Sequence, residues 1–262
     1  MRVLVTGAAR AIGRATVEVL AARGHEVVAT ARNPELLEGL PSAQVLALDV
    51  TNDESVRAAV DAAGELDAVV NNAGVPGAGP LETYPIASFV DVLEVNTLGP
   101  LRMAQAVAPS WRARGSGVLV NISSVQGKVG TPLEGPYAAS KHALEALSES
   151  LYFELGHFGI RVVIIEPGYI APGMKHGEER PIPEAYAELH AQWSGTAATL
   201  TGPQGRPAPE LVGVAVADAV EDPDTPLRVE VGNDATTVLE LRRTLDDAAF
   251  EATMRQALGL TW

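Results

Sequence analysis

The sequence predicts an α/β protein built on a doubly wound, parallel β-sheet of about seven strands. Segments with the apolar pattern of strands alternate with segments that have the pattern of helices. The strand-like segments are short continuous apolar runs, as expected where both faces of a parallel sheet are covered. A turn with glycine at both ends, Thr6–Gly13, joins the first strand-like run to the first helix-like run. Repeated strand–helix units with right-handed crossovers produce this architecture.

The predicted elements follow one another in a regular order. The predicted strands are Val3–Val5, Glu26–Ala31, Val45–Leu48, Leu66–Asn71, Gly117–Ile122, Ile160–Glu166 and Arg228–Val231. The predicted helices are Ile12–Arg23, Asp53–Ala63, Ile86–Ala108 with a break near Gly99 and Pro100, Tyr137–Leu155, and Asp246–Leu258. Ligands of such sheets bind beyond the carboxyl ends of the strands, so the loops after strands 1, 2, 4, 5 and 6 are the place to search for a site.

Length and composition restrict the class of protein. The chain has 262 residues, which fits one domain over residues 1–262. Its net charge of −14 argues against nucleic acid and against an anionic membrane surface as partners. It has no cysteine, which excludes disulfides and thiolate catalysis. No signal-like leader precedes the first strand, and no apolar run has the length of a membrane span, so we expect a cytoplasmic protein.

Residues 171–210 interrupt the alternation of strands and helices. The stretch contains six prolines and one predicted short helix, Glu184–Trp193. A long irregular segment inside a compact domain is often a lid or a binding loop. Because it follows a strand end on the ligand side of the sheet, we expect it to be a substrate lid rather than a surface excursion.

The turn after the first strand has the features of a phosphate-binding turn. Gly7 permits a tight turn out of the strand, and Gly13 permits close packing of helix on sheet. The amino end of the following helix offers free N–H groups and a positive dipole to a pyrophosphate. Arg32, about 20 residues further on, stands at the end of the second strand. A basic residue there suits a 2′-phosphate, and Arg10 inside the turn could assist.

A second group of residues points to proton transfer. The fifth strand ends in Ser123 and Ser124, and Tyr137 follows Ser124 by 13 residues. Tyr137 and Lys141 are four residues apart, so they share one face of a helix. A free tyrosine has a pKa near ~10, and a nearby ammonium group lowers that value. We therefore expect Lys141 to lower the pKa of Tyr137 for proton transfer, with a serine hydroxyl holding the same substrate oxygen.

From Met1 to about Pro172 the chain resembles the short-chain dehydrogenase/reductase family, of the type with roughly 250 residues. Several independent motifs carry the resemblance, in the order the family has them. They are Thr6-Gly7 with Gly13, Asp49-Val50, Asn71-Asn72-Ala73-Gly74, Asn96, Ser124, Tyr137 with Lys141, and Pro167-Gly168. The resemblance implies a Rossmann-type fold and hydride transfer between a nicotinamide cofactor and a carbonyl or alcohol.

The resemblance also implies the roles of the residues. Tyr137 would donate or accept the proton, Lys141 would lower its pKa and hold the nicotinamide ribose, and Ser124 would bind the substrate oxygen. Asn96 would support a water chain to Lys141. The residues expected to bind the cofactor are Gly7, Arg10, Ile12, Gly13, Arg32, Asp49, Val50, Asn72, Ala73, Gly74, Tyr137, Lys141, Pro167, Gly168 and Ile170. With Arg32 in place, we expect NADP(H) rather than NAD(H).

Two positions depart from the family pattern. Ala11 stands where the family has a glycine, and we expect a negative φ there, at which alanine costs little. A positive φ would introduce strain of about 1 kcal/mol or somewhat more. Pro172 replaces a threonine that often reaches the carboxamide of the cofactor in this family.

Other residues give weaker indications. The five histidines show no metal-binding spacing, so we expect no metal site, and His142 is expected on a helix surface. Side chains that could line a substrate cleft are those of Tyr84, Tyr169, Tyr186 and Trp193.

The leading hypothesis is an NADP(H)-dependent oxidoreductase that acts on a secondary alcohol or its carbonyl, and the stretch Val28–Arg32 resembles members that handle apolar ketones. The alternatives are a nucleotide-binding sensor or scaffold without turnover, and a lyase or epimerase. A homodimer or homotetramer is expected by analogy, with a two-fold interface formed by the helices Ile86–Ala108 and Tyr137–Leu155. The apolar positions of the second helix are Leu144, Leu147, Leu151 and Leu155.

Overall fold

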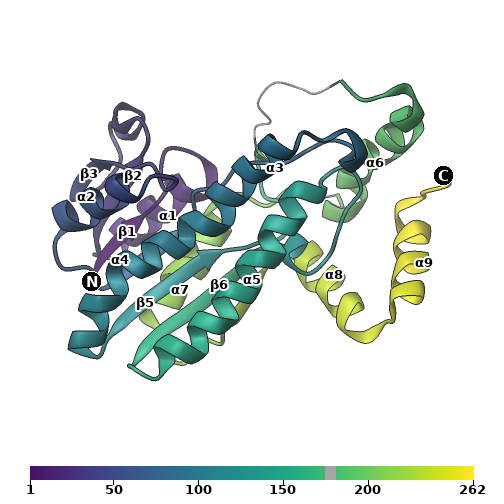
Figure 1. Cartoon of the computed structure of the whole chain (residues 1–262). Coiled ribbons are helices and arrows are strands. Elements are labelled where there is room, and N and C mark those ends of the chain that lie inside the picture. Colours follow the sequence, from purple (N-terminus) through teal and green to yellow (C-terminus); the bar gives the residue numbers. More distant parts are fainter. Residues whose placement is uncertain (175–180, 204) are drawn as a thin grey trace.

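A computed structural model of the chain describes residues 1–174, 181–203 and 205–262, and its centre is one parallel sheet of seven strands (Figure 1). The strand order is β3-β2-β1-β4-β5-β6-β7, and every neighbouring pair is parallel. The strands are β1 (Arg2–Val5), β2 (Glu26–Ala31), β3 (Gln44–Ala47), β4 (Ala68–Asn71), β5 (Gly117–Ile122), β6 (Ile160–Pro167) and β7 (Arg228–Val231). The order reverses between β1 and β4, so the predicted doubly wound architecture is confirmed.

Helices cover both faces of the sheet. The helices are α1 (Ala11–Ala22), α2 (Asp53–Ala63), α3 (Ile86–Leu93), α4 (Gly99–Arg114), α5 (Gly135–Gly156), α6 (Ala187–Thr201), α7 (Glu210–Glu221), α8 (Asn233–Thr244) and α9 (Asp247–Leu258). Short turns of helix lie at η1 (Pro34–Leu37), η2 (Leu81–Thr83), η3 (Glu94–Leu98), η4 (Val125–Gly127) and η5 (Glu184–Tyr186). One core packs α1 and α7 on the sheet, and the other packs α2, α4 and the end of α5 on its opposite face.

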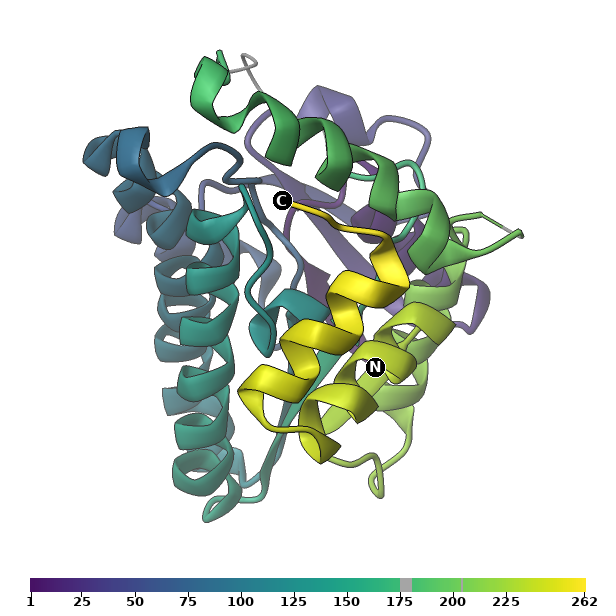
Figure 2. The same cartoon turned by 90° about the vertical axis from the view of Figure 1, so that its right-hand side faces the viewer.

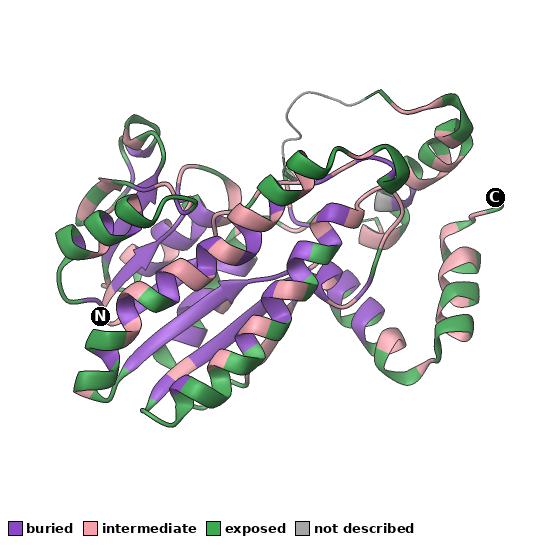
Figure 3. Ribbon diagram, viewed as in Figure 1, coloured by how far each residue is buried: buried purple, intermediate pink, exposed green. Residues whose placement is uncertain are grey.

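The apolar runs of the sequence become the buried strands of the sheet. Every residue of β4 and β5 is buried, and Figure 3 shows the central strands in purple between helices whose outer faces are green. Trp111 of α4 is 1% exposed, and its indole N–H donates to the carbonyl of Leu66 at 2.6 Å. It lies flat on Gly117, where an added Cβ would come within 2.3 Å of the indole. This contact fixes α4 on the sheet at the amino end of β5.

The helical stretch after residue 86 differs from its prediction. The backbone stays helical from α3 to α4, and the irregularity is a π-helical turn at Glu94–Leu98. Gly99 and Pro100 do not break the helix: they directly follow the π-helical turn, at the first two positions of α4. α4 then continues to Arg114, six residues beyond the predicted end.

The predictions for the last ninety residues were less complete. The predicted helix Glu184–Trp193 corresponds to η5 and α6, and α6 continues to Thr201. The helices α7 and α8 were not predicted. α7 packs against α1 so closely that a Cβ at Gly213 would lie 3.0 Å from the carbonyl of Ala15. Figure 2 shows α6 and α9 close together on the side of the molecule away from β3.

Candidate active site

The turn between β1 and α1 is shaped by close backbone contacts. Gly7 has a φ of 66°, and a Cβ there would lie 2.8 Å from the Cα of Ala73. A Cβ at Gly13 would lie 2.4 Å from the Asn72 amide nitrogen. The predicted tight turn at Gly7 is confirmed by its positive φ, and the close approach at Gly13 is to the loop after β4 and to the turn itself. The hydroxyl of Thr6 accepts from the backbone N–H groups of Asn72 and Ala73, at 3.0 Å each.

Ala11 contradicts the expectation of a negative φ. Its φ is 41°, in the left-handed region. The turn geometry requires this conformation at the first residue of α1, and the alanine methyl group does not prevent it. The family has glycine at this position because glycine adopts a positive φ without strain. With alanine there, this chain carries the strain of the left-handed conformation.

The amino end of α1 has the donors that a phosphate group needs. Arg10 is the N-cap residue, and its side chain makes no capping hydrogen bond. The first amide groups of a helix have no partner inside the helix, so those of α1 are available to an anion. Arg10 is exposed next to them, and Ile12 lies partly buried against the core. This donor set fits the pyrophosphate of a dinucleotide.

The ends of β2 and β3 form the adjoining edge of the site. Arg32 is exposed directly after β2. The carboxylate of Asp49 accepts from the backbone N–H and the hydroxyl of Thr51, at 3.0 and 2.8 Å. These bonds, followed by the charges of Arg32 and Arg102, hold the pKa of Asp49 below its ordinary value. Asp49 is therefore the acidic group of this edge, and Arg32 is close enough to act on it.

The next part of the site follows β4, where Gly74 is exposed. Asn96, in the π-helical turn, is fully buried and accepts at 2.8 Å from the backbone N–H of Val75. Its amide donates to the Val75 carbonyl at 2.9 Å and to the Ser140 hydroxyl at 3.0 Å. Asn96 thus joins the loop after β4 to α5. π-Helical turns are often found at functional sites. Here the π-helical turn directs the buried Asn96 side chain at the backbone of the loop after β4.

The fold brings Ser124, Tyr137 and Lys141 together. Ser124 follows β5 and caps η4 by accepting from the N–H of Gln126 at 3.1 Å. The Ser124 hydroxyl is close enough to Tyr137 to lower the pKa of its phenol. The Lys141 ammonium group donates to the carbonyl of Ile122 at 2.7 Å and lies 5.6 Å from the centre of the Tyr137 ring. One hydroxyl, one phenol and one buried amine therefore meet at the carboxyl end of β5.

The expected effect of Lys141 on Tyr137 is wrong for the protein alone. Burial raises the pKa of Tyr137 to about 12, the nearby Ser124 hydroxyl lowers it, and the charge of Glu134 adds to the rise. Lys141 directs its amine at a backbone carbonyl rather than at the phenol. Burial lowers the pKa of Lys141 itself to about 8, and the charge of Glu145 opposes that shift. Burial is therefore the main influence on both groups.

The loop after β6 is held by a residue that the sequence analysis did not identify. Asp234, in the first turn of α8, accepts from the backbone N–H of Tyr169 at 2.6 Å. A Cβ at Gly168 would lie 2.2 Å from the same carboxylate, so only glycine fits there. Pro167 ends β6, and Ile170 is buried at 7% exposure. An acidic residue just after the last strand, near the predicted ligand side, was the available signal for Asp234.

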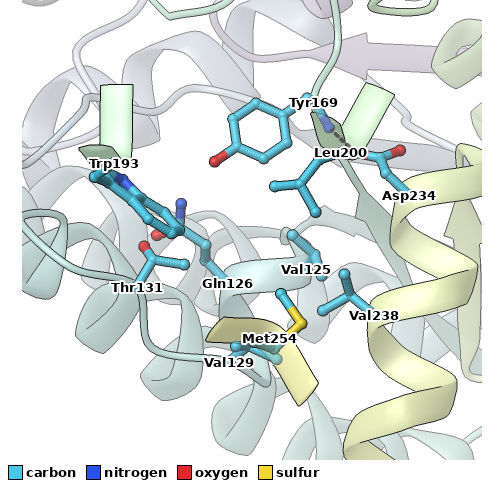
Figure 4. A pocket seen from close by; sticks show the side chains of 10 residues that line it. All are labelled: Val125, Gln126, Val129, Thr131, Tyr169, Trp193, Leu200, Asp234, Val238 and Met254. Carbon is cyan, nitrogen blue, oxygen red and sulfur yellow. Dashed lines mark hydrogen bonds between the residues drawn. The ribbon is translucent and has the colours of Figure 1, made fainter. Parts of the chain in front are cut away.

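A pocket opens beside the serine. Its cavity volume is small, about 30 Å³. Figure 4 shows the lining side chains: Val125, Gln126, Val129, Thr131, Tyr169, Trp193, Leu200, Asp234, Val238 and Met254. Val125 and Gln126 directly follow Ser124, and the Tyr169 hydroxyl points toward the side formed by Trp193 (Figure 4). The wall is mostly apolar, with a polar edge at Gln126 and Thr131.

The four aromatic candidates from the sequence lie in different places. Tyr169 and Trp193 line the pocket beside Ser124, as expected. Tyr84 lines a second, proline-rich pocket, and Tyr186 interacts with Glu82.

His142 is on the surface of α5, as expected. Within the described ranges, no cluster of three or more potential metal ligands is present, and no helix is long and apolar enough to span a membrane.

A doubly wound sheet with a phosphate-binding turn and grouped Ser, Tyr and Lys side chains has the features of a dinucleotide-dependent oxidoreductase. The sequence profile of the short chain dehydrogenase family matches residues 1–182. The chain belongs to the short-chain dehydrogenase family.

Solved structures agree with this assignment. A short-chain dehydrogenase from Streptomyces avermitilis is 34% identical, with a TM-score of 0.83 over 100% of this chain and 99% of that chain. A short chain dehydrogenase from Burkholderia cenocepacia, in complex with NADP, is 26% identical, with a TM-score of 0.78 over 100% and 98%. A 3-oxoacyl-[acyl-carrier protein] reductase from Brucella melitensis, with bound NAD, is 30% identical, with a TM-score of 0.74 over 89% and 90%. Similar proteins therefore hold either nucleotide.

Proposed function

We propose that this protein is an NADP(H)-dependent oxidoreductase that interconverts a ketone or aldehyde with its alcohol. The observation that carries the proposal is the meeting of Ser124, Tyr137 and Lys141 beside a pocket, at the same sheet edge as the phosphate-binding turn. The nicotinamide, when bound, supplies or accepts the hydride. The protein positions the substrate and moves one proton.

Each side chain has one task in this proposal. Tyr137 gives its phenolic proton to the substrate oxygen during reduction and takes it back during oxidation. Ser124, whose hydroxyl lies near Tyr137, holds the same oxygen. Lys141, whose amine lies 5.6 Å from the centre of the Tyr137 ring, must turn from the Ile122 carbonyl to stabilise the phenolate. Asn96 fixes the loop backbone through Val75 and thereby the floor of the nicotinamide site.

The proposed preference for NADP(H) depends on two exposed cations. Arg32 stands at the end of β2, where the ribose of a dinucleotide lies in this fold, and Arg10 caps the phosphate-binding turn. Asp49, on the neighbouring strand end, accepts both hydrogen bonds from Thr51 at Oδ1. A 2′-phosphate would find two positive charges here.

A titration with NADPH and NADH, followed by nicotinamide fluorescence, tests this preference. Arg32→Ala should weaken NADPH binding roughly 10-fold or more, the equivalent of one charge-assisted hydrogen bond, and leave NADH binding nearly unchanged. Arg14→Ala is the matched control, because Arg14 is exposed on α1 and pairs with Glu18. Equal binding of both nucleotides by the unchanged protein would remove the 2′-phosphate role of Arg32.

The pocket supports a substrate with an apolar body. Five of its lining side chains are Val125, Val129, Leu200, Val238 and Met254, and the carbonyl would enter beside Ser124. We further propose that residues 171–210 act as the lid of this pocket, a range in which 175–180 and 204 lie outside the described residues. The support is that Trp193 and Leu200, both on α6, form part of the wall. A panel of ketones of increasing apolar size, assayed with NADPH, should show kcat/KM rising with size.

A homodimer or homotetramer in a cytoplasmic setting completes the proposal. Leu144 and Leu155 are buried within the chain at 1% and 8% exposure, so the predicted leucine stripe is largely core. The exposed apolar side chains of α5 are instead Tyr152 and Phe153, at 43% and 76%. A monomeric mass by light scattering at micromolar concentration would reject the oligomer.

A further inference from the structure

A buried group of charged side chains lies on the side of α5 that carries Lys141, and the proposed reaction does not use it. Glu145 of α5 and Glu166 of β6 are 3% and 2% exposed. Arg228 of β7 lies between them, with its Nε 3.0 Å from Glu145 Oε2 and 3.6 Å from Glu166 Oε1. The ammonium group of Lys128 is 3.3 Å from the same oxygen of Glu145. Two carboxyl groups thus share the positive charges available to them.

The position of Glu145 relates this group to the active site. Tyr137, Lys141 and Glu145 follow one another at intervals of four residues in α5, so each is one helical turn from the next on the same face. Lys141 and Glu145 are both buried, at 4% and 3% exposure. Opposite charges one turn apart, with little solvent between them, act on each other more strongly than a surface pair does.

Several polar atoms of this region have no partner. Among the described residues, Glu145 Oε1, Glu166 Oε1 and the Ser123 hydroxyl are buried without a hydrogen bond. A Cβ at Gly127 would lie 2.6 Å from the Ser123 hydroxyl oxygen and 3.1 Å from Glu145 Oε1, so glycine keeps this space small. Burial, with the charge of Glu145 next, raises the pKa of Glu166 to about 7.

We propose that Glu145 is a positioning residue that keeps buried Lys141 positively charged during proton transfer. The proposal rests on the proposed function, in which the charge of Lys141 stabilises the phenolate of Tyr137. A neutral amine could not do so. Below about pH 7 Glu166 is mostly protonated and Lys141 is charged in any case. At higher pH, burial favours loss of the lysine proton, and the negative charge of Glu145 opposes that loss.

The groups that set the charge of this region come from four elements of the described structure. Glu149, on α5, bonds to Arg228 at 2.6 Å and lies near the surface. Lys128 follows η4, Arg228 is on β7, and Glu166 is on β6. Because Lys128 competes for Glu145, its removal should strengthen the effect of Glu145 on Lys141, whereas removal of Glu145 should abolish it.

The test is an NMR titration of the lysine side chains. The chain has three lysines, Lys128, Lys141 and Lys175, so their ¹³Cε signals can be assigned by single substitutions. Glu145→Gln should lower the pKa of Lys141 by about one unit, as expected for the loss of a charge at this range. Glu149→Gln is the matched control, on the same helix and bound to the same arginine, and should leave that pKa in place. The alkaline limb of the kcat profile should move with Glu145→Gln by the same amount.

A second variant keeps the inference testable if Glu145→Gln does not fold. Lys128→Met changes a half-exposed side chain and should raise the pKa of Lys141 by a few tenths of a unit, in the direction opposite to Glu145→Gln. A folded Glu145→Gln protein whose Lys141 titrates as in the unchanged protein would overturn the inference. A lower pKa of Lys141 in the Lys128→Met protein would also overturn it. The titration needs neither cofactor nor substrate, so its result is separate from that of the activity assay.

Discussion

The two sides of this active site are built by different means. On the nucleotide side, the turn of Gly7 and Gly13 fits against the loop of Asn72 and Ala73 with no room for a further carbon atom. On the substrate side, the pocket is formed by side chains such as Val238 and Met254, which contribute shape and no directed bond. A position packed this closely against backbone accepts only glycine, whereas a position in an apolar wall accepts several kinds of apolar side chain. The first side is therefore expected to change slowly among related proteins, and the second to set the substrate.

Asp234 supports the substrate side. It binds the N–H of Tyr169, whose ring lines the pocket, and it closes over Gly168 in the loop after β6. Its carboxylate thus holds the backbone of Tyr169 by a hydrogen bond, and its side chain forms part of the pocket wall. The following experiments separate the two sides, from the largest expected effect to the smallest.

Tyr137→Phe should break the chemistry and leave the nucleotide side intact. Loss of a general acid lowers kcat by roughly 10²- to 10⁴-fold. NADPH affinity, measured by fluorescence, should change little, because the turn at β1 does not depend on the phenol. Tyr152→Phe, an exposed position on the same helix, serves as the control and should retain full activity. An active Tyr137→Phe protein would refute the assigned role.

Asp234→Ala should act on the substrate side. The N–H of Tyr169 loses its acceptor, which costs about 1–3 kcal/mol in the free energy of unfolding. The KM for a ketone should rise because the pocket wall loosens, while NADPH affinity stays within about twofold, below 0.5 kcal/mol. Denaturant unfolding and steady-state kinetics measure the two effects, with exposed Asp224→Ala as the comparison. Weaker NADPH binding with an unchanged KM would show that Asp234 belongs to the nucleotide side.

Ala11→Gly should have the smallest effect and should sharpen the account of the turn. Relief of the left-handed strain outweighs the added flexibility of the unfolded chain, so stability should increase by about 0.5–1 kcal/mol. The same substitution at Ala21, in the last turn of α1, should instead destabilise by about 0.5–1 kcal/mol. Chemical denaturation of both variants gives the two signs. A loss of stability at both positions would contradict the strain assigned to Ala11.

The sequence predicted some features of the site better than others for a physical reason. Gly7, Gly13 and Lys141 were identified because turn geometry and helical spacing require particular residues at particular intervals. The φ of Ala11 was predicted wrongly, since a residue type does not determine the conformation that its neighbours impose. The pKa of Tyr137 was also predicted wrongly, because burial depends on side chains that only the fold brings together.

The C-terminal third shows the same limit. The helices α7 and α8 carry no motif, and valines with Gly213 in α7 do not distinguish a buried helix from a strand. Glu145 lies four residues after Lys141 in the sequence. That spacing does not show whether Glu145 is a buried partner of Lys141 or a charged residue on the helix surface. Arg228 and Glu166 join it only when β6 and β7 pair.

The segment after α9 has a consequence for how new specificities could arise in such a protein. Thr261, in the segment after α9, and Gln192 of α6 are joined by two hydrogen bonds, at 2.8 and 2.9 Å. This tail, residues 259–262, is therefore attached to the helix that carries Trp193. Met254 of α9 lies in the same wall. Directed evolution could therefore start at this tail, far in sequence from Tyr137, and remodel the range of accepted molecules without touching the residues that perform the reaction.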